Sequence, residues 1–266
     1  MAPAFDETAL PSSTVQQRDI TYVERATGPV KFDLFTPPGD GPFPLVIWIH
    51  GGAWKLGSKS EWSHMNFLAG EGYAIANVEY RFSQVAPFPA QLDDCSAALD
   101  YVVEHARELK LDPARIAVSG ESAGGHLAAL LGMTRASSTT QPTGRIRAVI
   151  DLFGPTDMAG MAARPSEEGV ITQLLGGPIE TKRELARQAS PLEHVSKDAP
   201  PFLILHGSAD PLVPLDQSQR LANALTAVGV KAQLVTIDGA GHAGPAFWTE
   251  TQREAMRAFL KETLAP

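Results

Sequence analysis

Hydrophobic and polar positions along this chain follow two patterns. Near the N-terminus, residues 18–25 and 30–36 alternate between apolar and polar positions, which predicts an antiparallel strand pair turning around Gly28 and Pro29. Further along, short and mainly apolar segments are bounded by glycine, proline or polar residues, which is typical of buried strands. Six segments of this kind are predicted as strands: residues 45–49, 73–78, 115–119, 146–153, 202–205 and 232–237.

Segments with the apolar spacing of a helix separate most of these strands. The longest covers residues 89–109, where the apolar positions include Leu92, Cys95 and Leu99. Further helices are predicted over residues 123–133, over residues 215–228, where Gly229 ends the helix, and over residues 247–264. This alternation predicts an α/β fold with a mostly parallel central sheet that helices cover on both faces.

Residues 155–200 interrupt the alternation, with weaker apolar periodicity and the turn-forming runs Gly176-Gly177-Pro178 and Pro200-Pro201. A segment of this length is too short for a domain of its own. We therefore expect a single domain over residues 1–266 that contains a short lid or loop excursion at 155–200. Ligands of open parallel sheets bind outside the carboxyl ends of the strands, so chemistry is expected directly after each predicted strand.

Composition excludes several classes of protein. The 266 residues are 44% hydrophobic and 20% charged, as in ordinary globular domains, and the net charge of −8 disfavours nucleic acid as a partner. The single cysteine, Cys95, excludes an intrachain disulfide and a cysteine-rich zinc site. No apolar run approaches the about 20 residues that span a bilayer, and the first residues do not resemble a signal peptide. We expect a cytoplasmic protein, with a processed secreted form as the alternative.

A nucleophile motif follows the predicted strand at 115–119. The run Gly120-Glu121-Ser122-Ala123-Gly124 matches G-x-S-x-G and lies between a predicted strand and a predicted helix. In so sharp a turn, glycines at the flanking positions avoid collisions with neighbouring elements, and the free N–H groups of the helix N-terminus lie beside the serine. Ser122 is therefore predicted as a catalytic nucleophile, whereas the alternative is a glycine-rich turn with an idle serine.

A serine hydroxyl needs a base that accepts its proton, and the base needs an acid that orients it. Among seven histidines, His242 is the expected base because it lies in a glycine-rich loop after the last predicted strand, and His126 is the main alternative. Asp210, which follows the strand at 202–205, is the expected acid. The rival acids are Asp157, Asp216 and Asp238.

The segment 50–54 follows the predicted strand at 45–49 and reads His-Gly-Gly-Ala-Trp. Acyl transfer builds negative charge on a carbonyl oxygen, which preorganised N–H donors stabilise. The expected donors are the N–H groups of Ala123, Gly52 and Ala53, with Gly51 as the alternative in the loop if the register differs by one.

Other side chains near these segments are weaker candidates for a functional role. Trp54 and Trp248 are candidate walls of a substrate pocket, although core positions are the more common role for tryptophan. Glu121 and Arg81 are expected to form a buried ion pair under the turn, because a buried charge needs a partner.

Taken together, these segments resemble a known family. The resemblance rests on the motifs at 50–54, 120–125, 206–210 and 241–242, supported by segments at 79–81, 154–157, 189–191 and 200–204. The chain resembles the α/β-hydrolase carboxylesterases related to hormone-sensitive lipase, and is more similar to the compact branch that holds acetylxylan and feruloyl esterases. The resemblance extends from about residue 18 to the C-terminus.

The resemblance implies a catalytic triad of Ser122, Asp210 and His242, with an oxyanion hole formed by the His-Gly-Gly loop and Ala123. Two features depart from the hormone-sensitive lipase family. The chain has too little sequence before its first strands for the large N-terminal helical cap, and Ala53 replaces a third glycine. A reduced cap implies an open site that admits bulky alcohol groups, including sugars.

The expected function is therefore that of a serine carboxylesterase, which hydrolyses short-chain esters through an acyl-serine intermediate. Acetyl or feruloyl esters of plant polysaccharide are the candidate substrates, as small molecules or oligosaccharides. One alternative is an arylformamidase-like amidase of the same fold, and a distant one is a non-catalytic ligand receptor. We expect no metal and no cofactor because the triad carries the whole reaction, and a homodimer through an edge strand would be unsurprising.

Overall fold

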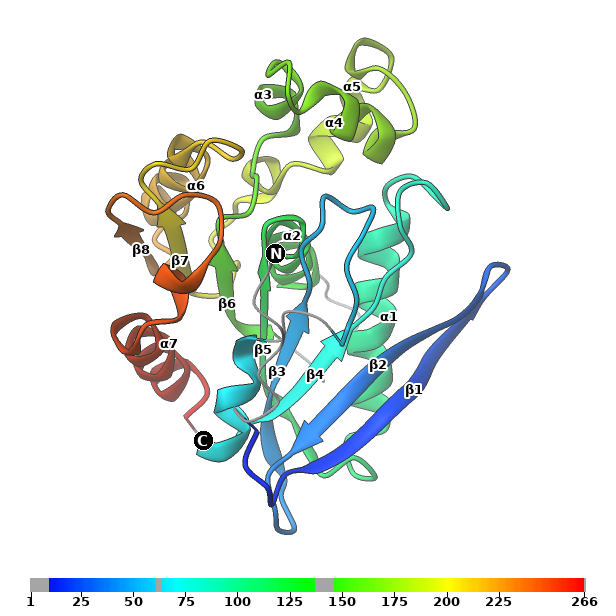
Figure 1. The fold of residues 1–266 in the computed structure, drawn as a ribbon, viewed down its shortest axis with the longest axis vertical. Coiled ribbons are helices and arrows are strands. Elements are labelled where there is room, and N and C mark those ends of the chain that lie inside the picture. The colour runs from blue at the N-terminus through cyan, green and yellow to red at the C-terminus, as the bar shows by residue number, and fades with distance from the viewer. Residues whose placement is uncertain (1–9, 61–63, 137–145, 266) are drawn as a thin grey trace.

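The computed structural model describes residues 10–60, 64–136 and 146–265. The strands form one eight-stranded sheet in the order β1-β2-β4-β3-β5-β6-β7-β8 (Figure 1). They are β1 (Val15–Arg25), β2 (Gly28–Thr36), β3 (Phe43–Ile49), β4 (Ala74–Val78), β5 (Leu111–Glu121), β6 (Ile146–Leu152), β7 (Phe202–Gly207) and β8 (Ala232–Ile237).

Strand directions follow the two sequence patterns. β1 pairs with β2, and β2 with β4, in antiparallel fashion, and Arg25 faces Gly28 at the predicted turn. All pairs from β4 through β3, β5, β6 and β7 to β8 are parallel. The predicted mostly parallel sheet is therefore confirmed, and the carboxyl ends of its parallel strands meet at one edge.

Side chains of the sheet alternate between two hydrophobic clusters, as the pleat of a strand requires. In β3, Leu45, Ile47 and Ile49 join one cluster, whereas Val46 and Trp48 join the other. The first cluster packs under α1 (Ala90–Glu104), α2 (Ala123–Ala136) and α6 (Leu215–Ala227). The second packs under η2 (His64–Glu71) and α7 (Glu250–Thr263).

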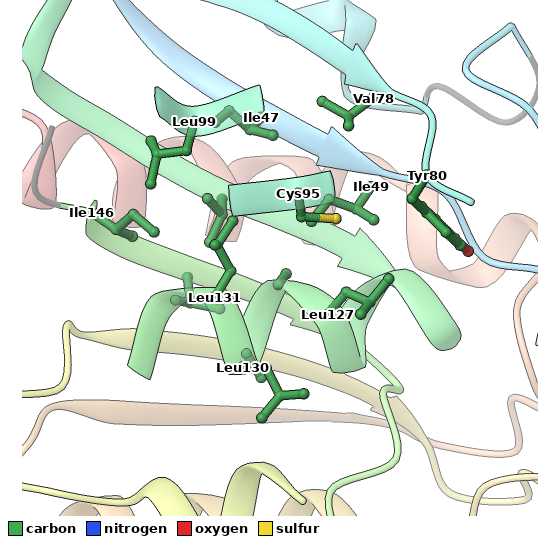
Figure 2. Close-up of a cluster of buried hydrophobic side chains, with 14 of the residues drawn as sticks. Ile47, Ile49, Val78, Tyr80, Cys95, Leu99, Leu127, Leu130, Leu131 and Ile146 are labelled. Atoms are coloured by element: carbon green, nitrogen blue, oxygen red, sulfur yellow. The ribbon is translucent and has the colours of Figure 1, made fainter. Parts of the chain in front are cut away.

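Figure 2 shows part of the first cluster, where apolar side chains from α1 and α2 meet those of the sheet. Its labelled members are Ile47, Ile49, Val78, Tyr80, Cys95, Leu99, Leu127, Leu130, Leu131 and Ile146. Because both faces of the sheet are covered at its centre, β3, β4 and β7 are buried at nearly every position, which explains their apolar runs.

The segment 155–200 lies between β6 and β7 and holds several short helices. They are α3 (Met158–Ala162), α4 (Glu168–Leu175), η3 (Ile179–Thr181), α5 (Arg183–Gln188) and η4 (Pro191–His194). In Figure 1, α3, α4 and α5 group beyond the ends toward which the arrows of β3 and β6 point. We call residues 155–200 the cap segment. Its buried side chains, among them Met158, Leu174 and Leu175, join the first cluster.

The structure changes the predicted bounds of two helices. The closing helix is divided into η5 (Pro245–Trp248) and α7, because Thr249 between them has an extended backbone with φ −66° and ψ 162°. The helix predicted over 89–109 ends at Glu104, and β5 begins as early as Leu111. Lys110, at φ 58°, reverses the chain just before that strand.

Candidate active site

Ser122 lies at the junction of β5 and α2 in a strained backbone conformation. Its φ is 53°, in the left-handed region that costs a residue with a side chain on the order of 1 kcal/mol. The Ser122 N–H donates to the carbonyl of Leu152 at 2.8 Å, which ties the turn to β6. The sequence therefore places the serine at the carboxyl edge of the sheet, as predicted from its motif.

The glycines on each side of Ser122 are required by close backbone packing. A Cβ on Gly124 would lie 2.0 Å from the carbonyl oxygen of Ile49, and one on Gly120 would lie 2.4 Å from the backbone of Gly124. Real Cβ atoms do not approach other atoms so closely, so β3, β5 and α2 meet only because these positions lack side chains.

The structure brings Ser122, His242 and Asp210 into one hydrogen-bonded series. His242 Nε2 lies 2.9 Å from Ser122 Oγ, and His242 Nδ1 lies 2.7 Å from Asp210 Oδ2. The three residues follow β5, β8 and β7 respectively. The Asp210 side chain is fully buried, whereas the His242 side chain is 14% exposed.

Asp210 is held in its ionised form. Burial alone would raise its pKa, but hydrogen bonds from His206 and His242 and from the Val213 N–H outweigh burial and hold the pKa well below its usual range. Asp210 Oδ1 accepts from the N–H groups of Leu212 at 2.9 Å and Val213 at 3.0 Å. A fixed, charged carboxylate can orient His242 and stabilise it in its protonated form.

His206 supports this carboxylate, a role that its sequence position did not reveal. Its Nδ1 lies 2.7 Å from Ser218 Oγ, and its Nε2 lies 2.9 Å from the carbonyl of Val213 and 3.3 Å from Asp210 Oδ2. Because a carbonyl accepts only, Nε2 carries a proton. Phe153 adds a further contact, since its ring centroid lies 4.7 Å from that of His242.

The rival acids have other partners. Asp157 caps α3 by accepting from the Gly160 N–H at 3.0 Å and pairs with Arg220. Asp238 accepts from Ser208 at 3.2 Å, and Asp216 lies in the first turn of α6. Of the four candidate acids, Asp210 is the one that the structure places against His242.

The loop after β3 has three successive residues at positive φ: Gly52 at 108°, Ala53 at 52° and Trp54 at 57°. Among the described residues, the N–H groups of Gly52 and Ala53 donate to no backbone carbonyl. The Gly51 carbonyl accepts from His50 Nδ1 at 2.7 Å, and burial lowers the His50 pKa to about 4, so this ring is neutral.

The two candidate pocket tryptophans lie in different places. Trp54 is 3% exposed, and its indole N–H donates to His126 Nδ1 at 3.1 Å. Trp248 packs edge-to-face on Trp48 and stacks on His64 with 4.4 Å between ring centroids, against the second cluster. His126, the alternative base, is fully buried and bonded on both ring nitrogens, to Trp54 and to Ala189, away from Ser122 Oγ.

The predicted Glu121–Arg81 pair is wrong. Arg81 forms its ion pair with Asp94, with 2.8 Å between Nε and Oδ2. Burial raises the pKa of Glu121 to about 8, so this carboxyl is mostly neutral at pH 7 and needs no cation. The prediction failed because it assumed that the buried acid is charged.

Within residues 10–60, 64–136 and 146–265, no group of three or more His, Cys, Asp or Glu side chains is placed to hold a metal ion. In the same part of the chain, no helix has the length and apolar character needed to cross a membrane.

Known proteins with similar sequences show which family this chain belongs to. The profile of the BD-FAE family matches residues 32–225, which covers most of the sheet and all three motifs before His242. This chain belongs to the BD-FAE family. Curated relatives of this BD-FAE chain include carboxylic ester hydrolases and esterases. One is the probable carboxylic ester hydrolase LipM of Mycobacterium tuberculosis, 33% identical over 71% of this chain and 46% of LipM. The chain spans about half the length of the first curated relatives it matches.

Solved structures give the same result for the fold. The BD-FAE chain is similar to a truncated carbohydrate esterase from gut microbiota, with a TM-score of 0.85 and 28% identity over 97% of this chain and 99% of that one. It is also similar to an esterase of Thermogutta terrifontis, with a TM-score of 0.78 and 25% identity over 96% of this chain and 97% of the other. The predicted α/β-hydrolase fold and the resemblance to ester hydrolases are therefore confirmed.

Proposed function

We propose that this BD-FAE chain is a serine carboxylesterase that hydrolyses short-chain carboxylic esters, with Ser122, His242 and Asp210 as its catalytic triad. The hydrogen-bonded series from Ser122 Oγ through His242 to the buried Asp210 carboxylate carries the proposal. Membership of a family whose curated relatives are ester hydrolases supports it.

The chemistry follows from these contacts. Ser122 Oγ attacks the ester carbonyl carbon while His242 Nε2 accepts the hydroxyl proton, and a tetrahedral oxyanion forms. Its collapse breaks the bond to the alcohol oxygen, which takes the proton from His242 and leaves an acyl-serine. Water then repeats the sequence: His242 accepts its proton, the second tetrahedral intermediate collapses, and the carboxylic acid leaves as Ser122 regains its proton.

We assign the oxyanion hole to the N–H groups of Ala123, Gly52 and Ala53. Ala123 opens α2, where the first N–H groups lack partners within the helix, and the two loop N–H groups have no backbone acceptor among the described residues. The buried Gly51 stays the alternative for one loop donor. Losing one such donor typically lowers kcat by about a hundredfold to a thousandfold.

Acetyl or feruloyl esters of plant polysaccharide are the substrate class that we propose. A neighbour with a TM-score of 0.85 is a carbohydrate esterase, and the Thermogutta terrifontis esterase is known in propionate-bound and butyrate-bound forms. The cap segment is built from short helices, which leaves more room for a sugar than a large helical cap would.

The test compares kcat/KM for p-nitrophenyl acetate, butyrate, octanoate and laurate, in wild type and in Ser122→Ala. We expect acetate or butyrate to lead and the variant to lose about a millionfold in kcat. Release of acetate from acetylated xylan, or of ferulate from methyl ferulate, then selects the substrate. Turnover of an N-formyl aromatic amide in preference to all esters would indicate the arylformamidase alternative instead. Full activity of Ser122→Ala would contradict the mechanism.

A further inference from the structure

The loop that carries Gly52 and Ala53 needs external support. Ala53 and Trp54 both have side chains, yet both lie in the left-handed region, at φ 52° and 57°. Such residues cost on the order of 1 kcal/mol each and persist only where surrounding contacts hold them. Relaxation of either residue would rotate the peptide groups that carry the proposed donors, the N–H groups of Gly52 and Ala53.

Three contacts hold the end of this loop. The Trp54 carbonyl accepts from the Ser83 N–H at 2.8 Å, and the Lys55 carbonyl accepts from Gln84 Nε2 at 2.8 Å. Both tie the loop to the segment after β4. The third contact is the Trp54 indole N–H, which donates to His126 Nδ1 at 3.1 Å and is the one that reaches α2.

His126 belongs to the first turns of the helix that begins beside Ser122. Its backbone N–H donates to the Ser122 carbonyl at 3.0 Å, and its ring Nε2 lies 2.6 Å from the Ala189 carbonyl in the cap segment. Because a carbonyl accepts only, Nε2 carries the ring proton and Nδ1 is free to accept from Trp54. Burial lowers the pKa of His126 to about 4, so the ring keeps this neutral form near pH 7.

We propose that the buried Trp54–His126 hydrogen bond positions the two halves of the oxyanion hole relative to each other. One half is the loop with Gly52 and Ala53, and the other is Ala123 on α2. Trp54 and His126 are thus positioning residues that act through the donors and do not touch the reacting atoms. The proposal rests on the proposed function, because it concerns the oxyanion hole of that reaction.

The structure offers a matched pair of tryptophan variants. Trp54→Phe removes an N–H that donates to His126, whereas Trp48→Phe removes an N–H that has no hydrogen-bond partner among the described residues. Both tryptophans are buried, at 3% and 0% exposure, so the loss of packing is comparable. His126→Asn keeps an acceptor near the position of Nδ1, and His126→Leu removes it.

Each variant is assayed for kcat and KM with p-nitrophenyl acetate and for the Ki of a methyl trifluoromethyl ketone, whose serine adduct carries an oxyanion. For Trp54→Phe we expect kcat to fall about tenfold, Ki to rise by a similar factor and KM to change less than about twofold. His126→Leu should change kcat and Ki by the same factors as Trp54→Phe. The double variant Trp54→Phe/His126→Leu should lose no more in kcat or Ki than either single variant. For Trp48→Phe and His126→Asn, kcat and Ki should both stay within about threefold of the wild-type values.

Equal Ki values for Trp54→Phe and Trp48→Phe would overturn the proposal, as would additive losses in the double variant. Should His126→Leu fail to fold, the comparison of the two tryptophan variants with His126→Asn still decides. Failure of the proposed function is recognised separately, because wild type would then turn over no ester and would not be inhibited by the ketone.

Discussion

Two carboxyl groups beside the Ser122–His242 pair have pKa values shifted in opposite directions. Both are buried, and burial disfavours the charged form. The Asp210 carboxylate accepts from two backbone N–H groups and two histidines, which lowers its pKa in spite of burial. Glu121 has burial as its one cause of shift, and its pKa rises to about 8. The number of donors around each carboxyl therefore decides its charge at pH 7.

The raised pKa of Glu121 makes stability depend on pH. The unfolded chain releases this proton near pH 4.5 and the folded protein near pH 8, so between them the folded state binds more protons. The free energy of unfolding therefore falls as pH rises through this range, by up to about 1.4 kcal/mol per pH unit. Glu121→Gln keeps the shape and cannot ionise.

Urea denaturation of wild type and Glu121→Gln at intervals from pH 5 to 9 measures how much Glu121 contributes to the pH dependence of the free energy of unfolding. The stability of the variant relative to wild type should rise from pH 5 to about 8 and level off above it. A difference that stays constant with pH would show that Glu121 ionises alike in both states. Subtracting the free energy of unfolding of wild type from that of the variant at each pH removes the contributions of all other titrating groups.

Single residues at strand ends were predictable, whereas their partners were not. Ser122, Asp210 and His242 each directly follow a strand or lie in the next loop, and parallel strands bring their carboxyl ends to one edge. The contact of His206 with Asp210 depends on the direction of a buried ring, which no spacing in the sequence expresses. The same holds for the partner of Arg81, which is Asp94.

At the scale of elements, the close approach of β3, β5 and α2 depends on Gly124. Gly124→Ala would place Cβ 2.0 Å from the Ile49 carbonyl oxygen, where backbone atoms on both sides leave little room to move. We expect a loss of about 3 kcal/mol or more in the free energy of unfolding, and a displaced Ser122 with little residual esterase activity. Chemical denaturation followed by enzyme assay measures both.

Gly169→Ala is the control for this substitution. Gly169 lies in α4, its φ is not positive, and a Cβ there would meet no described atom within 4 Å. The replacement should stabilise the protein by between about 0.5 and 1 kcal/mol through helix propensity, and leave activity unchanged. Comparable stability losses in both variants would show that packing against Ile49 is not the cause.

Elements with strong periodicity were predicted well, and their ends less so. Every strand of the described residues was located: β1 and β2 from their alternating pattern, and the parallel strands from their short apolar runs. The division of the closing helix at Thr249 was missed, because the prediction placed the apolar residues from Phe247 to Leu260 in one continuous helix. Thr249 precedes α7 with an extended backbone, and Phe247 of η5 and Met256 of α7 both join the second cluster.

At the scale of the whole molecule, buried ion pairs join segments that are distant in the sequence. Asp94 of α1, with a fully buried side chain, accepts from Arg25 of β1 and from Arg81 after β4. Lys59, in the segment after the 50–54 loop, lies 2.9 Å from Asp33 of β2 and 3.0 Å from Asp19 of β1. These pairs fasten the antiparallel ribbon to the parallel part of the sheet, and the sequence did not predict them.

Lys59 provides the test of this role. Its side chain is 8% exposed and that of Asp33 is 1% exposed, so Lys59→Met would leave a buried carboxylate with Arg18 as its remaining cation. Removing one partner of a buried pair costs about 3 kcal/mol, whereas an exposed pair contributes less than about 1 kcal/mol.

Lys231→Met is the control, because Lys231 and its partner Glu262 are 51% and 59% exposed. We expect the Tm of Lys59→Met to fall by about 6 °C or more and that of Lys231→Met by less than about 4 °C. Equal shifts would mean that the ribbon is held by its strand pairing and apolar contacts alone, with the buried charges adding no net stability.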